Sequence, residues 1–225
     1  MTGRFKPRMD ILPPAQRRLW PELCHAPPLG FTLYGGTAIA LRLGHRHSVD
    51  FDFFSEKPLE REAIAKAFPF VARSTTLQDQ GDAWVMLAPC NGSDAERVKL
   101  SFFGSIAFGR AGEPDFTEDG VLRVASFDDL MATKVKVVLQ RAEAKDYHDV
   151  AAMIRAGTSL PRALACARLM FGPNFQPSES LKALTYFNDG DLKTLTAPEK
   201  NTLVDAVKAV RDLPAVALRS TRLAD

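Results

Sequence analysis

Two carboxylates at alternate positions of an apolar run are the side chains of this sequence best placed to do chemistry. They are Asp50 and Asp52, interleaved with Phe51 and Phe53. In an extended strand, residues i and i+2 point to the same face, so the two carboxylates would stand side by side. Ionised carboxylates this close repel each other unless they share a cation. Mg²⁺, or alternatively Mn²⁺, fits such a pair, because it takes one or two protein carboxylates and completes its shell with water and phosphate oxygens. The pattern predicts chemistry on a nucleotide.

A pair of glycines upstream fits the same chemistry. Gly35 and Gly36 follow the apolar run 31–34, which predicts a buried strand, and precede the run 37–43, which predicts a short helix. Glycine lets the backbone approach a ligand closely, and the start of a helix offers unpaired N–H groups to an anion such as a triphosphate. Either motif alone has an ordinary explanation, a tight turn or a solvated strand face. Their order and spacing make the combination more specific.

Basic side chains nearby in the sequence are candidates for binding phosphate. Arg46 and Ser48 lie just before the carboxylates, and the planar guanidinium of arginine suits phosphate oxygens. Lys134 and Arg141 are seven positions apart in a predicted helix, hence on one face, and could reach a nucleotide. The alternative for these two is a pair of solvated basic residues, which is common on helices.

These motifs resemble a known family. The glycine pair, a spacer of thirteen residues (37–49) and the alternating carboxylates resemble the signature of the nucleotidyltransferase superfamily with the polymerase-beta-like fold. The fuller runs 35–38 and 45–54 are similar to the AbiEii/AbiGii toxins, the nucleotidyltransferase-like toxins of abortive-infection and type IV toxin–antitoxin systems. Lys134, Arg141 and the run 145–149 resemble the later Lys and [KR]-D-x-x-D motifs of that family. The resemblance covers roughly residues 30–155.

The resemblance implies a role for each of these positions. Asp50 and Asp52 would hold the Mg²⁺ that bridges the triphosphate of an NTP, and Lys134 would neutralise charge. Asp146 or Asp149 would face the active site as a base or as a supporting acid. On spacing alone, helix capping and an i,i+4 pair with Lys145 would explain these two aspartates better. The nucleotide-binding positions would be Gly35, Gly36, Thr37, Arg46, Ser48, Arg141 and Lys145.

One departure from the superfamily pattern concerns a third carboxylate. That acid stands on a later strand and often acts as general base, but the expected position here holds Ser101. Three explanations remain open. The base comes from elsewhere, for example Asp146 or Asp149; the acceptor needs no strong base; or the site binds a nucleotide without turning it over.

The elements that position these residues change in character near residue 125. Strands are predicted at 31–34, 50–54, 70–77, 83–89, 97–103 and 121–124, helices at 15–23 and 58–68, a loose segment at 1–10 and a loop at 108–120. Helices follow at 126–141, 145–157, 158–171, 178–187 and 197–212, the last with capping-box spacing. With the resemblance, this predicts an α+β fold: a mixed sheet with flanking helices over 1–125, then a helical bundle over 126–225 that contributes Lys134 and Asp146 or Asp149 to the cleft.

Bulk properties are those of an ordinary globular protein. The 225 residues carry a net charge of +2, which neither requires nor excludes a nucleic-acid partner. The three cysteines lack zinc spacing and predict buried free thiols in a reducing cytosol. No apolar run has transmembrane length, and residues 1–18 lack the apolar core of a secretory signal, so we expect a cytoplasmic protein without a membrane partner.

Two functions of different classes remain. The first is an Mg²⁺-dependent nucleotidyltransferase that moves a nucleotidyl group from an NTP to RNA, with tRNA as a candidate, or to a protein hydroxyl. By family, it would be a toxin neutralised by an antitoxin. The alternative is a non-catalytic module of the same fold that binds NTP or RNA, which Ser101 and the modest net charge favour. A purely structural role for the helical half leaves the glycine and aspartate motifs unexplained.

Overall fold

The computed structural model describes residues 3–90 and 93–224 as two compact units. The first comprises Met1–Gly109, Glu113–Ala125 and Ser220–Asp225, and the second comprises Arg110–Gly112 and Ser126–Arg219. The main change of unit thus follows Ala125, but two short segments, Arg110–Gly112 and Ser220–Asp225, each belong to the unit on the other side of this boundary. The expected division into 1–125 and 126–225 places its boundary at the same point and does not describe these two segments.

Specific contacts explain the placement of both segments. The backbone N–H of Ala111 donates to a carboxylate oxygen of Asp129 (2.6 Å), which ties 110–112 to the helical unit. Leu223 is fully buried in the first unit, where its N–H donates to Glu56 (3.0 Å) and its carbonyl accepts from the Thr32 hydroxyl (3.3 Å). A short local sequence pattern gives no sign of either contact, because the partners are far away along the chain.

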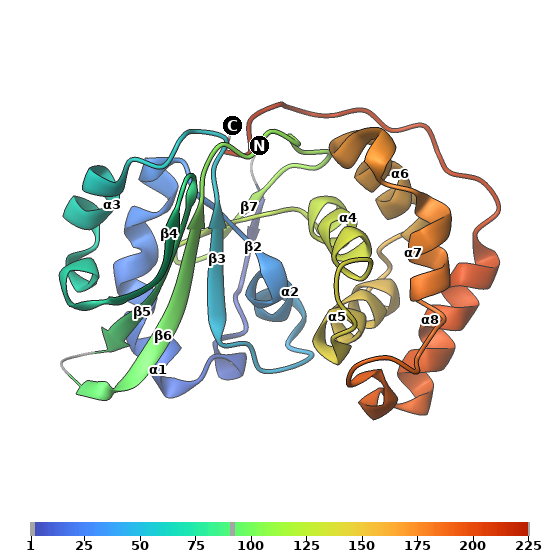
Figure 1. The fold of residues 1–225 in the computed structure, drawn as a ribbon, viewed down its shortest axis with the longest axis horizontal. Coiled ribbons are helices and arrows are strands. Elements are labelled where there is room, and N and C mark those ends of the chain that lie inside the picture. Colours follow the sequence, from blue (N-terminus) through green and yellow to red (C-terminus); the bar gives the residue numbers. More distant parts are fainter. Residues whose placement is uncertain (1–2, 91–92, 225) are drawn as a thin grey trace. The chain divides into compact units, whose positions relative to one another are not determined.

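The first unit is built on an eight-stranded mixed sheet in the order β1-β7-β8-β2-β3-β6-β5-β4 (Figure 1). The strands are β1 (Arg4–Phe5), β2 (Thr32–Tyr34), β3 (Asp50–Phe54), β4 (Thr75–Gln80), β5 (Ala83–Cys90), β6 (Ser93–Phe103), β7 (Asp115–Thr117) and β8 (Arg123–Val124). The central strand β3 runs antiparallel to β2 and parallel to β6. The predicted antiparallel pairing of β5 with β6 is confirmed; their connection includes residues 91–92, which lie outside the described residues.

The two faces of this sheet differ in character. Phe51, Phe53 and Phe102 are fully buried on one face, with the rings of Phe53 and Phe102 stacked 5.3 Å apart. The helices α1 (Pro14–Leu19) and α3 (Arg61–Ala67) lie on this side, and α2 (Gly35–Leu43) lies on the other (Figure 1). Burial of the phenylalanine face fixes the register of β3 and thereby directs its alternate residues to the α2 side.

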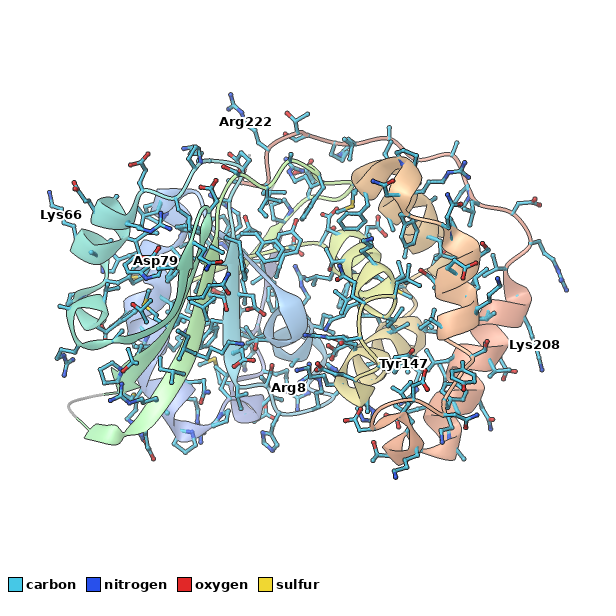
Figure 2. All side chains as sticks on the ribbon, viewed as in Figure 1. Arg8, Lys66, Asp79, Tyr147, Lys208 and Arg222 are labelled. Atoms are coloured by element: carbon cyan, nitrogen blue, oxygen red, sulfur yellow. The ribbon has the colours of Figure 1, made fainter. Side chains whose placement is uncertain are left out.

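The second unit is helical, as predicted. Its helices are α4 (Phe127–Val137), α5 (Ala144–Arg155), α6 (Leu160–Phe171), α7 (Pro177–Ala183) and α8 (Ala197–Ala209). The side chains of Ser126, Ser159 and Thr196 cap α4, α6 and α8, and the predicted capping box of Thr196 with Glu199 is present. Tyr147 is buried inside this unit, where its hydroxyl donates to the carbonyl of Ala183 (3.1 Å) (Figure 2).

Several local predictions were wrong in detail. The segment 70–77 was predicted as one strand but divides into a 3-10 helix over Pro69–Arg73 and β4. The predicted loop at 108–120 contains β7, and the predicted loose N-terminus contains β1, which pairs with β7. The first helix ends as α-helix at Leu19, because Pro21 has no N–H to continue the hydrogen-bond ladder. α4, α7 and α8 end three or four residues earlier than predicted.

Two further findings concern the cysteines and the helices. Cys90 and Cys166 are buried, but Cys24 is exposed, contrary to the prediction, and all three are free. Burial raises the pKa of the Cys166 thiol to about 11.

None of the helices within residues 3–90 and 93–224 has the length and apolarity needed to cross a membrane.

Candidate functional site

The two carboxylates of β3 share one face of the sheet, as the alternation predicts. Asp50 and Asp52 are half-buried, whereas Phe51 and Phe53 between and beyond them are fully buried on the opposite face. The side chain of Asp50 is 35% exposed. The phenylalanines therefore anchor the strand and leave the carboxylates on the side of the sheet where α2 lies.

Gly35 brings the start of α2 against the second of these carboxylates. Its φ is +74°, in the left-handed region that favours glycine, and a Cβ at this position would lie 2.5 Å from Oδ2 of Asp52. Two independent constraints, conformation and close approach, thus require glycine here. Together with Gly36, it begins a helix whose first N–H groups have no partner within the helix, so they can receive an anion.

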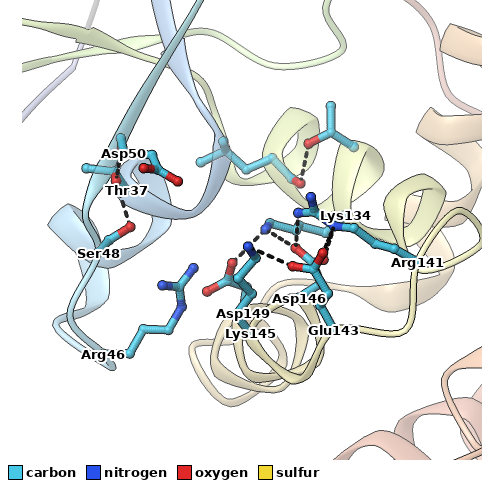
Figure 3. A network of polar contacts seen from close by, with 12 residues as sticks. Thr37, Arg46, Ser48, Asp50, Lys134, Arg141, Glu143, Lys145, Asp146 and Asp149 are labelled. Atoms are coloured by element: carbon cyan, nitrogen blue, oxygen red, sulfur yellow. Dashed lines mark hydrogen bonds and ion pairs between the residues drawn. The ribbon is translucent and has the colours of Figure 1, made fainter. Parts of the chain in front are cut away.

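Thr37 and Ser48 join the start of α2 to the start of β3. Thr37 is buried, and its hydroxyl donates to the carbonyl of Asp50; the hydroxyl oxygens of Thr37 and Ser48 are 2.7 Å apart (Figure 3). These side chains therefore hold Asp50 in place. What Thr37 offers to a ligand in this arrangement is its backbone N–H in the first turn of α2.

The neighbouring strand β6 supplies the residues opposite the carboxylates. Asp52 pairs in register with Ser101, which is buried, and Asp50 pairs with Lys99. The Nζ atom of Lys99 lies 3.7 Å from Oδ2 of Asp50. The register thus places Ser101 beside the carboxylate pair, where sequence reasoning looked for a third acid. The sequence analysis assigned no role to Lys99. Its position two residues before Ser101 was a sign that both side chains lie on the face that carries Asp50 and Asp52.

A second polar cluster lies in the helical unit. Lys134 of α4 is buried, with its Nζ atom 2.6 Å from Oδ1 of Asp146 and 2.7 Å from Oδ2 of Asp149. Both aspartates belong to α5 and are fully buried. Arg141 donates to Asp146 from Nε (2.8 Å) and from Nη2 (3.2 Å), as Figure 3 shows. The later motif residues predicted from the sequence therefore do come together, as a network of two cations and two anions.

The electrostatics of this cluster favour an ionised Asp146. Burial alone would raise the pKa of its carboxyl, but the hydrogen bonds and charges of Arg141 and Lys134 outweigh burial and hold that pKa below its ordinary value. An aspartate with a lowered pKa and two cationic donors is a weak proton acceptor. Its clearest capability is to orient the ammonium of Lys134 within the helical unit.

The two remaining basic candidates have local partners. Arg46 donates from Nη1 to the carbonyl of His47 (3.0 Å). Lys145 lies 2.7 Å from Glu143, an ion pair at the start of α5. Both side chains are long, so a ligand phosphate could compete for them.

The donor set of β3 fits a hard divalent cation. Among residues 3–90 and 93–224, no group of three or more His, Cys, Asp or Glu side chains is arranged to hold a metal ion. Asp50 and Asp52 would therefore supply two oxygen-donor groups, and water and phosphate oxygens would supply the rest. This division of ligands is the one that Mg²⁺ uses with nucleotides.

A solved structure shares this fold. The solved structure of MenT4, a nucleotidyltransferase toxin from Mycobacterium tuberculosis H37Rv, is similar with a TM-score of 0.50 over 85% of this chain and 90% of that chain, at 14% identity. At this identity the similarity shows the fold, and it confirms the predicted α+β class.

Sequence comparison is more specific. The family model of the nucleotidyl transferase AbiEii toxin of type IV toxin–antitoxin systems matches residues 23–215. An uncharacterized protein of Aquifex aeolicus (strain VF5) is 30% identical over 162 residues, 71% of this chain and 74% of that protein. The chain belongs to the AbiEii nucleotidyl transferase toxin family, which confirms the resemblance seen in its motifs. The match continues past residue 155, so the helical unit is part of what the family shares.

Proposed function

We propose that this chain is an Mg²⁺-dependent nucleotidyltransferase that transfers a nucleotidyl group from an NTP to a hydroxyl of RNA or protein. As a toxin, it would be neutralised by a cognate antitoxin protein. The observation that carries the proposal is the pair Asp50 and Asp52, half-buried on one face and beside the glycine-lined start of α2.

The residues of the first unit divide the work of binding. The first N–H groups of α2, at Gly36 and Thr37, bind phosphate oxygens of the NTP. Asp50 and Asp52 would hold Mg²⁺, which would supply neutralisation of the phosphate charge. The acceptor oxygen replaces pyrophosphate at the α-phosphorus. The contact of Thr37 with the Asp50 carbonyl fixes the backbone from which the first carboxylate projects, so little backbone reorganisation is needed when the nucleotide binds.

The buried cluster of the helical unit is the second part of the proposal. Its positions match the later motif of the family, and its ammonium is held by two carboxylates. Within this cluster, Lys134 carries the positive charge. Asp146 and Asp149 fix the position of its ammonium group.

Loss of a β3 carboxylate tests the proposal. Purified protein is incubated with Mg²⁺ and each α-labelled NTP in turn. The acceptor is total RNA or a lysate of the cells that express the protein. We expect transfer with at least one NTP, and none with Asp50→Asn or Asp52→Asn. The matched control is Asp79→Asn, the same change on the edge strand β4 of the same sheet (Figure 2), which should transfer normally. Undiminished transfer by Asp50→Asn would refute the mechanism.

A non-catalytic role in binding NTP or RNA is the second candidate. The buried Ser101 opposite Asp52, in place of an acid, favours it. The same assay separates the two, because nucleotide retained on the protein without transfer of label to any acceptor would support binding alone.

A further inference from the structure

The lysine opposite Asp50 is unusual in a site meant to collect cations. Lys99 and Asp50 are register partners on adjacent parallel strands, so their side chains rise from the same face of the sheet. Nζ and Oδ2 are 3.7 Å apart, and the side chains of Lys99 and Asp50 are 41% and 35% exposed. A fixed positive charge thus lies beside one of the two candidate metal ligands.

Stability does not explain this pair. A charge-assisted hydrogen bond is about 2.7–2.9 Å long, clearly shorter than the separation here. Ion pairs between partly exposed side chains contribute little to folding. A lysine ammonium on a flexible stem, loosely paired, can exchange a carboxylate for a phosphate oxygen when a polyanion arrives.

The charges beside the site favour one divalent ion over two. A two-metal centre holds its ions about 3.5–4 Å apart and needs acidic ligands for both. Here Asp50 and Asp52 supply two negative charges and Lys99 removes one, while the position opposite Asp52 is Ser101. Among residues 3–90 and 93–224, no third His, Cys, Asp or Glu side chain completes a metal-binding group with this pair. A second divalent ion would therefore meet the ammonium of Lys99.

We propose that Lys99 takes the place of a second metal ion. This inference rests on the proposed function: the site holds one divalent cation, and the ammonium of Lys99 donates to a phosphate oxygen of the NTP. In the reaction, the acceptor oxygen bonds to the α-phosphorus and the bond from that phosphorus to the β-phosphate oxygen breaks. Pyrophosphate leaves with the electron pair, and the acceptor's proton passes to water.

Titration with Mn²⁺ alone tests the inference independently of catalysis. By electron paramagnetic resonance, we expect one Mn²⁺ per chain for the wild type and for Lys99→Met. The variant should bind it about fifteenfold more tightly, the factor that repulsion between a unit and a double charge about 5 Å apart gives at the dielectric constant of water. Lys99→Asp, which adds a third acid opposite Asp50, should bind two. Two ions in the wild type, or an unchanged affinity in Lys99→Met, would overturn the inference.

The rate of nucleotidyl transfer by Lys99→Met should fall, although its affinity for Mn²⁺ should rise. Lys99→Met loses a donor to developing charge, so its kcat should fall by about a hundredfold. Lys99→Arg keeps the charge and should retain most of the activity. Lys66→Met, on helix α3 of the same unit (Figure 2), is the matched control and should change neither measurement. Equal kcat for Lys99→Met and wild type would also overturn the inference.

The two proposals fail differently. If the wild type transfers label from no NTP, the proposed transferase activity is wrong, and the Mn²⁺ titration still decides whether Lys99 stands in for a cation. If transfer occurs but two Mn²⁺ ions bind, the transferase survives and the role of Lys99 does not.

Discussion

Gly35 offers a sharp test of the geometry at the start of α2, because another glycine shares its conformation without its neighbour. Gly35 has a φ of +74° and Gly120 a φ of +72°. A Cβ at Gly35 would meet the Asp52 carboxylate at 2.5 Å, whereas a Cβ at Gly120 has nothing within 4 Å. Replacing each by alanine therefore separates the cost of the backbone conformation from the effect on the carboxylate.

The two variants should lose similar stability. A left-handed conformation costs a residue with a Cβ about 1–2 kcal/mol, and both positions share that cost. At Gly35 the nearest atom is the end of a half-buried side chain, which can turn aside with little further loss. We expect urea denaturation to give a loss of about 1–2 kcal/mol in the free energy of unfolding for each variant.

Function should distinguish them. Gly35→Ala turns the Asp52 carboxylate away from the start of α2 and removes one of two metal ligands, so Mn²⁺ binding and nucleotidyl transfer should be lost. Gly120→Ala should keep both. If Gly35→Ala bound Mn²⁺ and transferred label as well as Gly120→Ala does, the close contact between Gly35 and Asp52 would have no functional meaning, and this reasoning would be refuted.

Two further predictions concern the buried cluster. Lys134→Met leaves Asp146 and Asp149 buried without one of their cations. The free energy of unfolding measured in urea should therefore fall by about 3–5 kcal/mol. A loss no larger than that of the exposed control Lys208→Met (Figure 2) would contradict a buried network. The lowered pKa of Asp146 adds stability that is present above the ordinary aspartate pKa of about 3.9 and is lost as the pH falls through the lower folded value. Asp146→Asn should therefore be less stable near neutral pH but should lose less stability on acidification, as followed by circular dichroism; parallel acid unfolding of variant and wild type would count against that assignment.

Local patterns in the sequence predicted the parts of the site that short-range geometry determines. The alternation of Asp50 and Asp52 with phenylalanine was enough to place both carboxylates on one face, because burial of Phe51 and Phe53 fixes the strand. The glycine pair likewise predicted the start of α2, and the spacing of Thr196 and Glu199 predicted the capping box of α8. In each case the residues that interact lie close together in the chain.

What the sequence did not reveal depends on partners far apart in the chain. The pairing of Lys99 with Asp50 requires the register between β6 and β3, which are joined through α3, β4 and β5. The network around Lys134 follows from the packing of α4 on α5, and spacing alone favoured a capping explanation for Asp146. Local helix propensity also did not predict where some helices end, such as the end of α4 at Val137.

The return of the chain to the first unit has a consequence for biosynthesis. Leu223 fills the core of a unit whose strands β2 and β3 are translated long before it, and the whole helical unit comes between them. A ribosome must therefore synthesise all five helices before this core is complete, so a nascent chain carries Asp50 and Asp52 on an unfinished scaffold. For a toxin, such a delay separates synthesis from the onset of harm to the cell that makes it.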